Sequence, residues 1–405
     1  MKTIQVFALI FIITLISCGT DHAPIVFEEK PIVKLNLSEK ELYDKVLGMI
    51  VGSVIGYAMG APTEMWSRED IKTQYGYVTG LDSMVREASA EGPWKTNLGA
   101  GGTTDDTRWK KLTAEYLAKQ PSKDLQAEGF AQAILDQYNA SITNYSKIKS
   151  FDPEPFEENT LRVAWLQEWA KVSKPFIEKK YPEYHTALSK FYGGEMVCAG
   201  LLYAPAIGAF YPGDPTTAYN EMFNVSIYDL GYARDISALA AAMTAAGMPK
   251  DATKESIIAV LRSVDPQGYF KSRLVGRTSF NLFKTAQYLV NEARADTTDP
   301  LKKAFTLLDK PHEVMPFHAG EIYLEVLTAM LYADFDFVRT IQFLINYGRD
   351  NDTTAAVAGG ILGAFYGFDR LPADKSKVIK VGLEDLDINM EALAQQMTRR
   401  IIHLN

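Results

Sequence analysis

Two short acidic clusters, far apart in the chain, carry the residue types best suited to chemistry. One reads Thr-Asp-Asp-Thr at 104–107 and the other reads Asp-Asn-Asp-Thr at 350–353. Carboxylate and hydroxyl oxygens suit Mg²⁺, Ca²⁺ or Mn²⁺ and do not suit zinc. If the fold brings the clusters together, their like charges require counter-charge, and the simplest source is a pair of divalent cations. The six candidate ligands are Thr104, Asp105, Asp106, Asp350, Asp352 and Thr353.

Each cluster also opens a helix-like pattern, which allows a simpler interpretation. Trp109, Leu112 and Tyr116 recur at helical spacing after the first cluster. Acidic residues in a first turn interact favourably with the helix dipole, and Thr-x-x-Asp resembles an N-terminal capping sequence. Capping alone, however, requires neither the glycine-rich stretch 99–102 nor two adjacent aspartates.

Two glycine-rich helices are predicted to position the clusters. Ser38 and Glu41 fit a capping box that starts the first helix, in which glycine recurs at 48, 52, 56 and 60. Each glycine costs about 0.8–1 kcal/mol of helix propensity relative to alanine, so such a stripe is explained by close approach of another helix. An irregular segment is the alternative. The last helix, 352–364, carries glycine at 359 and 363, with Gly367 following. We predict that it contacts the first helix.

The rest of the chain indicates an all-α fold. Strand-like alternation is scarce, no repeat of 20–50 residues is evident, and 61–103 is loop-like. The stretch 145–190 is rich in aromatic and charged residues, and is either an insertion or part of a substrate wall. We predict one domain over 37–405. Further helices are expected at 123–139, 158–171, 195–209, 216–224, 233–247, 251–262, 277–294, 300–309, 319–332 and 335–346.

Composition restricts the class of protein. The 405 residues are 47% hydrophobic and 23% charged, which is enough for a large core. A net charge of -8 and the absence of a Lys/Arg cluster argue against nucleic acid as a partner. The five histidines lack zinc-like spacing, and we expect His312 and His318 to be surface or capping residues.

The N-terminus has the pattern of an export signal. Lys2 precedes an apolar run at 6–16 that is too short to span a bilayer. The sequence Leu-Ile-Ser-Cys ending at Cys18 resembles a bacterial lipobox, in which the cysteine is lipidated. We therefore expect a lipoprotein signal peptide at 1–18, a tether at 19–36, and a bacterial cell-envelope location facing the periplasm or the outer membrane. A plain secretory signal with an incidental cysteine is the alternative. With Cys18 acylated, Cys198 has no partner for a disulfide.

Three segments in order resemble the ADP-ribosylglycohydrolase family. They are 56–64, which ends at Glu64, then 104–107, and then 348–353. The resemblance covers about residues 42–370. Each motif alone is common, and the order of the three makes the resemblance more specific. It implies an all-α, compact orthogonal helical bundle with a binuclear Mg²⁺ or Mn²⁺ centre in a cleft.

The resemblance also implies roles for these residues. Thr104, Asp105 and Asp106 match the family's first ligand group, and Asp350, Asp352 and Thr353 match its second. Glu64 matches the catalytic-site glutamate beside the metals. The family hydrolyses the bond between C1 of ADP-ribose and its leaving group. Such cleavage passes through an oxocarbenium-like state that water attacks. We expect Glu64, or an aspartate such as Asp105 or Asp352, to orient or deprotonate that water.

The chain departs from the family pattern in two places. Tyr57 stands where the family often has aspartate, and the mid-chain Asn-Gly motif is replaced by Tyr-Gly-Gly-Glu ending at Glu195. Glu195 is interpreted as a first-turn helix residue. Asp229, Arg234 and Asp235 fall where the family often contacts substrate, and a surface ion pair is at least as good an interpretation.

Three functions fit these observations. The first is hydrolysis of an N- or O-glycosidic bond of ADP-ribose or an ADP-ribosylated group. The second is hydrolysis of another nucleoside or sugar conjugate on the same scaffold. The third is binding without catalysis. Metal-free glycosidase chemistry by an acid–base pair of carboxylates is also conceivable, but six oxygen ligands in two groups fit two ions better.

Overall fold

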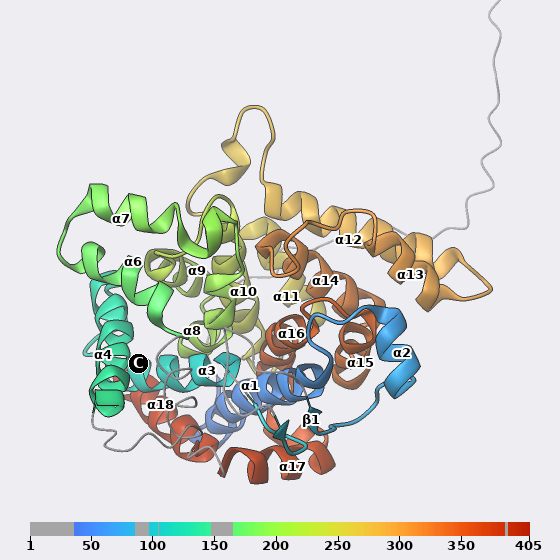
Figure 1. The fold of residues 1–405 in the computed structure, drawn as a ribbon, viewed down its shortest axis with the longest axis horizontal. Helices are drawn as coiled ribbons and strands as arrows, with labels where there is room; N and C mark the ends of the chain where they lie inside the picture. The colour runs from blue at the N-terminus through green and yellow to red at the C-terminus, as the bar shows by residue number, and fades with distance from the viewer. Residues whose placement is uncertain (1–35, 86–96, 104, 147–164, 385–387) are drawn as a thin grey trace, which may run out of the picture.

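The computed structural model describes residues 36–85, 97–103, 105–146, 165–384 and 388–405. Helices dominate these ranges, and one antiparallel pair of two-residue strands occurs among them, β1 (Met84–Val85) with β2 (Asn97–Leu98). The predicted all-α fold is confirmed (Figure 1). The expected signal peptide and nearly all of the tether lie outside the described residues, so both stay predictions.

Two helices pass through the centre of the fold, α1 (Glu39–Gly60) and α16 (Asn351–Tyr366). The expected capping box of Ser38 and Glu41 starts α1. The predicted contact of the glycine stripes is confirmed. A Cβ added to Gly52 would lie 2.4 Å from the Gly359 carbonyl oxygen, and one added to Gly363 would lie 2.0 Å from that of Gly48. The two backbones therefore touch directly, which only glycine permits.

The first helix is apolar enough to cross a membrane. The segment Glu39–Thr63 passes that test by length and composition, but its apolar window is entirely buried within the protein. In this structure α1 is therefore the central helix of the core.

Helices from the middle and end of the chain surround this pair. Against α16 pack α10 (Ala233–Gly247), α14 (Ala319–Tyr332) and α15 (Phe337–Tyr347). The short α8 (Ala204–Phe210) contacts both central helices. On the other side of α1 lie α3 (Asp105–Ala118), α17 (Ala373–Glu384) and α18 (Met390–Leu404).

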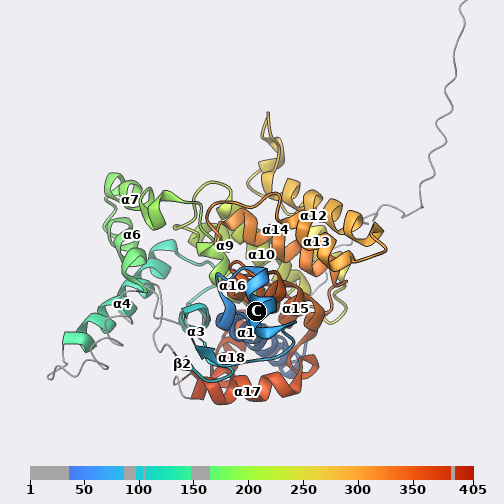
Figure 2. The same cartoon turned by 45° about the vertical axis from the view of Figure 1, so that its right-hand side comes forward.

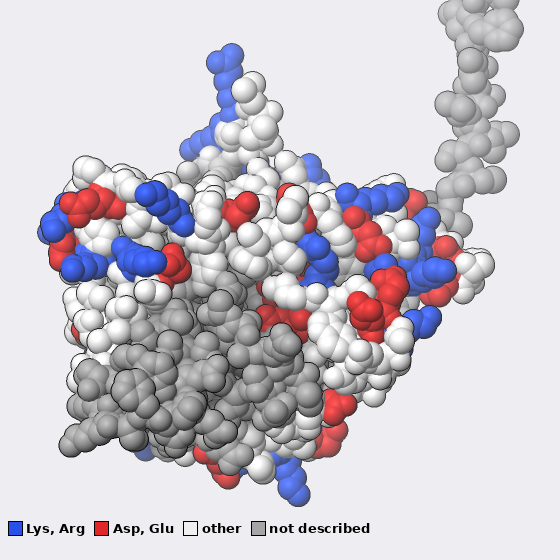
Figure 3. Space-filling view, in the orientation of Figure 1, with Lys and Arg blue, Asp and Glu red and all other residues white. Residues whose placement is uncertain are grey.

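The remaining elements form the periphery. Figure 2 shows α4, α6 and α7 extending sideways from the body, and Figure 3 shows basic and acidic side chains interspersed over α6, α7, α12 and α13. The peripheral helices are α2 (Arg68–Tyr75), α4 (Ala127–Ser146), α6 (Gln167–Ile177), α7 (Tyr181–Leu188), α9 (Pro215–Val225), α11 (Lys254–Ser263), α12 (Thr278–Ala295) and α13 (Pro300–Leu308). The 3₁₀ turns are η1 (Ala61–Thr63), η2 (Phe191–Gly194), η3 (Ala199–Leu202), η4 (Tyr269–Lys271) and η5 (Phe368–Arg370).

Two expectations about these elements were wrong. The segment 61–103, expected to be loop-like, contains α2, which buries only Ile71 and therefore has no apolar periodicity to reveal it. The helix expected over 195–209 is instead the 3₁₀ turn η3 followed by α8, and Glu195 precedes both as an exposed residue in extended backbone. It is therefore not the first-turn helix residue that the sequence suggested.

Candidate metal centre

The end of α1 and the start of α16 are joined by backbone hydrogen bonds. The amide of Met65 donates to the carbonyl oxygen of Arg349 at 2.7 Å. The amide of Arg349 in turn donates to the carbonyl oxygen of Trp66 at 3.1 Å. The Asn351 side chain donates to the Thr63 hydroxyl at 2.9 Å. These contacts hold Glu64, which directly follows η1, beside the first turn of α16.

Three carboxylates meet at this junction. Glu64, Asp350 and Asp352 each offer an oxygen within 4.8 Å of the other two. Asp350 and Asp352 are 3% and 2% exposed. Burial, and then the Glu64 carboxylate, raise the pKa of Asp352 well above its usual value. Burial is also the main reason that the pKa of Asp350 is raised. Ionised together, these groups require positive charge nearby.

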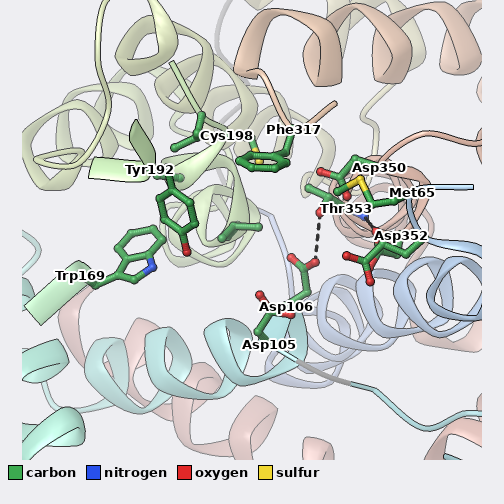
Figure 4. Close-up of a pocket in the computed structure, with 14 residues that line it drawn as sticks. Met65, Asp105, Asp106, Trp169, Tyr192, Cys198, Phe317, Asp350, Asp352 and Thr353 are labelled. Atoms are coloured by element: carbon green, nitrogen blue, oxygen red, sulfur yellow. Dashed lines mark hydrogen bonds between the residues drawn. The ribbon is translucent and has the colours of Figure 1, made fainter. Parts of the chain in front are cut away.

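The first acidic cluster reaches the same place from α3. Asp105 and Asp106 occupy the first turn of α3. The Thr353 hydroxyl donates to Asp106 Oδ2 at 3.4 Å (Figure 4). The two clusters therefore converge. The Tyr57 hydroxyl donates to Asp105 Oδ1 at 3.5 Å, so a neutral hydrogen-bond donor stands where the family often has a carboxylate. Thr104, the remaining expected ligand, lies outside the described residues.

A buried lysine completes this side of the centre, and the sequence reasoning missed it. Lys110 is 2% exposed, and its ammonium lies 3.5 Å from Asp106 Oδ1. Burial raises the pKa of Asp106 to about 7, against the lowering effect of Lys110. The available signal was a lysine four residues after Asp106, between the buried Trp109 and Leu112.

The donor set fits hard divalent cations. It consists of oxygens from carboxylates and a threonine, the ligands that Mg²⁺ and Mn²⁺ prefer. The buried Thr107 hydroxyl, on the first turn of α3, has no hydrogen-bond partner in the described structure. Metal-free glycoside cleavage needs two carboxyl groups, whereas three converge here within 4.8 Å of one another and Asp106 approaches them from α3. Ion binding is therefore the better account of this group.

A pocket opens over the carboxylates. Trp169 and Tyr192 form one side of it, opposite Asp350 and Asp352 (Figure 4). Trp169 belongs to the stretch 145–190. This stretch therefore contributes to the pocket wall, which was one of the two interpretations offered for it. The other lining residues were not predicted, because they come from turns whose positions only the fold sets. They are Met65, Val197, Cys198, Ala199, Leu202 and Phe317.

The other residues considered from sequence do not line this pocket. Asp229 is 7% exposed and accepts a hydrogen bond from the Gly200 amide at 2.7 Å. Asp235 is fully buried and pairs with Arg277 at 2.7 Å. The surface ion pair of Arg234 with Asp235 was therefore a wrong interpretation. Arg234 instead donates to the carbonyl oxygen of Phe223.

Comparisons with known proteins identify the fold and the family. A solved structure described as an ADP-ribosylglycohydrolase-related protein complex aligns with a TM-score of 0.54 at 17% identity, over 89% of this chain and 99% of that one. A comparison with curated protein sequences gives no match. The family model for ADP-ribosylglycohydrolase matches residues 38–402. The chain therefore belongs to the ADP-ribosylglycohydrolase family.

Proposed function

We propose that the protein is a metal-dependent hydrolase that cleaves an N- or O-glycosidic bond of ADP-ribose or of an ADP-ribosylated group. Family membership supports glycohydrolase activity in general. The observation that carries the proposal is the convergence of Glu64, Asp350 and Asp352 with Asp106 at the base of one pocket. Two divalent cations, Mg²⁺ or Mn²⁺, are the cofactors that suit this donor set.

Different residues of the chain would bind the ions, activate the water and line the pocket. Asp105, Asp106, Asp350, Asp352 and Thr353, with Thr104, would hold the ions. When bound, the ions supply positive charge that orients the ribose hydroxyls and lowers the pKa of water. Glu64 is only partly buried and faces the pocket, so it is suited to orient or deprotonate the water that attacks the anomeric carbon. The Tyr192 ring lines the pocket and can contact a sugar or base, and Trp169, which is 2% exposed, closes the same side against bulk water.

One observation favours a second candidate, a nucleoside or another sugar conjugate as substrate. Among the described residues that line the pocket, five are acidic and none is lysine or arginine. A diphosphate would therefore meet negative potential wherever the ions do not neutralise it. A less anionic glycoside avoids that cost.

Hydrolysis assays distinguish the candidates. Purified protein is incubated with ADP-ribosyl-arginine, ADP-ribosyl-serine or simple nucleosides, with Mg²⁺, with Mn²⁺ or with EDTA, and products are separated by chromatography. We expect release of ADP-ribose with metal and none with EDTA. Glu64→Gln should lose at least 100-fold in kcat, as expected for removal of an acid–base group, whereas the exposed Glu69→Gln control should not change. Cleavage of nucleosides alone supports the second candidate, and activity that EDTA leaves intact contradicts metal dependence.

The cellular location is proposed from sequence alone. Cys18 would carry the lipid that anchors the protein to the bacterial envelope. Labelling of expressing cells with radioactive palmitate should mark the wild-type protein and not Cys18→Ser. A cleaved but unlabelled wild-type protein would support plain secretion instead.

A further inference from the structure

A second group of side chains of metal-binding types lies outside the pocket, next to Arg349. His312, Glu321 and Glu325 each offer a donor atom within 4.8 Å of the other two. We call these three residues the His–Glu cluster. None of them lines the pocket over the metal centre. The two glutamates are one turn apart on α14, and His312 precedes that helix. The cluster is therefore a separate feature that the proposed hydrolysis does not use.

Glu325 is the unusual member of the cluster. Glu325 is 2% exposed, and both of its carboxylate oxygens are buried without a hydrogen-bond partner in the described structure. An ionised carboxylate buried in this way is costly unless a cation or donors satisfy it. Its nearest ligating neighbours are Glu321, which is also acidic, and His312. Glu325 thus brings a buried carboxylate without a hydrogen-bond partner to the cluster.

The other two members are already oriented by neighbours. Glu321 Oε1 accepts from Arg349 Nε at 2.6 Å, and Glu321 Oε2 accepts from the Glu313 amide at 2.7 Å. Each carboxylate oxygen has a second lone pair, so Glu321 can bind an ion while keeping both hydrogen bonds. The His312 ring contacts the Tyr347 hydroxyl. Partners of this kind commonly fix the orientation of metal ligands.

We propose that the His–Glu cluster binds one divalent first-row transition-metal ion at a site separate from the metal centre. One imidazole nitrogen with two carboxylates is a donor set found for Zn²⁺ and related ions, and it suits Mg²⁺ and Ca²⁺ less well. Such ions bind nitrogen and oxygen at about 2.0–2.2 Å, so donors must lie within about 4.4 Å of one another. The donor atoms lie within 4.8 Å of one another, so ion binding requires them to close by about 0.4 Å at most. A water molecule would fill the fourth position.

The electrostatics of the cluster support this assignment. Burial and the positive charge of Arg349 lower the pKa of His312, which keeps its imidazole neutral and able to bind an ion. Burial, and then Glu321, raise the pKa of Glu325 well above its usual value. The competing account is therefore a protonated Glu325 that shares its proton with Glu321. The two accounts differ in whether the cluster takes up a cation.

The number of Zn²⁺ ions bound per full chain distinguishes a bound cation from a shared proton. Bound Zn²⁺ is measured by calorimetry and elemental analysis for wild type, His312→Gln and Glu325→Gln, and for Asp350→Asn/Asp352→Asn, which disables the metal centre. We expect His312→Gln and Glu325→Gln each to lose one equivalent of Zn²⁺. Asp350→Asn/Asp352→Asn should retain that equivalent. His185→Gln/Glu183→Gln, on the exposed surface of α7, is the matched control and should bind as wild type does.

Thermal unfolding gives a second measurement. Saturating Zn²⁺ should raise the Tm of Asp350→Asn/Asp352→Asn by roughly 5 °C, and adding Glu325→Gln should abolish the rise. Since His312 is only partly buried, its variant tests the site even if Glu325→Gln folds poorly. Equal Zn²⁺ binding by wild type and both cluster variants would overturn the proposal. So would the absence of zinc binding in Asp350→Asn/Asp352→Asn, which would favour the shared proton. Neither outcome bears on hydrolysis with Mg²⁺.

Discussion

Gly60 packs against the backbone of Asp352, a proposed metal ligand, and replacing it by alanine should damage the proposed metal centre. A Cβ at Gly60 would lie 2.4 Å from the Cα and 2.6 Å from the backbone nitrogen of Asp352. Ordinary contacts of a Cβ begin near 3.4 Å, so the start of α16 must retreat by about 1 Å. Overpacking of this kind costs about 1–3 kcal/mol of unfolding free energy. Displacement of a ligand by about 1 Å also reduces catalysis by roughly 100-fold.

The assay compares stability with metal affinity. Urea unfolding gives the free energy of unfolding without metal, and titration calorimetry gives the Kd for Mn²⁺. Gly60→Ala should weaken Mn²⁺ binding at least tenfold. Gly52→Ala, two turns earlier in α1, also clashes with backbone but lies far from the carboxylates, so it should lose stability with a smaller change in Kd.

Gly129 in α4 is the matched control. A Cβ there would meet its nearest neighbour, the Tyr116 hydroxyl, at an ordinary 3.6 Å. Gly129→Ala should therefore stabilise the protein by about 0.5–1 kcal/mol through helix propensity. The reasoning would be refuted if Gly60→Ala were stabilising like Gly129→Ala, or if it bound Mn²⁺ as tightly as wild type.

Three further predictions concern buried charges. The pKa of Asp106 is raised to about 7 in the metal-free protein, so the stability that its protonated form provides at pH 5 is lost as pH rises through 7. The Tm in EDTA should therefore fall between pH 5 and pH 8, and Mg²⁺ should reverse the fall; a Tm in EDTA that rises over this range would contradict it. Lys110→Met removes the ammonium that competes with ions for Asp106 and should lower the Kd for Mn²⁺ by roughly tenfold. The control Lys111→Met changes a half-exposed lysine on the same helix, and calorimetry should show no change. Arg277→Met leaves Asp235 buried without its cation and should cost about 3–5 kcal/mol in urea unfolding. A loss below 1 kcal/mol would show that the remaining hydrogen bonds of Asp235 suffice.

Features that depend on local spacing were predictable from the sequence, and features that depend on chain packing were not. The glycine spacing predicted the contact of α1 with α16, because a bare stripe on a helix has few other uses. The same contact brings Glu64, which follows α1, beside the acidic cluster that begins α16. The other acidic cluster begins α3, so its position depends on packing that the glycine spacing does not encode. The burial of Lys110 and the wall formed by Phe317 required knowing which turns face the carboxylates. The apolar spacing of α18, at 390, 393, 394, 397 and 401, was readable, but our prediction stopped before it.

The hydrogen bonds around the metal centre divide it into two mechanical halves. Glu64 and Asp350 are held in a fixed relative position, because backbone hydrogen bonds of 2.7 and 3.1 Å join their neighbours Met65 and Trp66 to Arg349. The body of α3 packs on α1, α8 and α18, but its acidic first turn meets the central helices through side-chain hydrogen bonds of 3.4 and 3.5 Å, at the weak end of the range. A widening of the pocket would lengthen these two hydrogen bonds more easily than the backbone bonds. Ions bound by carboxylates of both halves would hold the halves together, so that ion occupancy and access to the pocket are coupled.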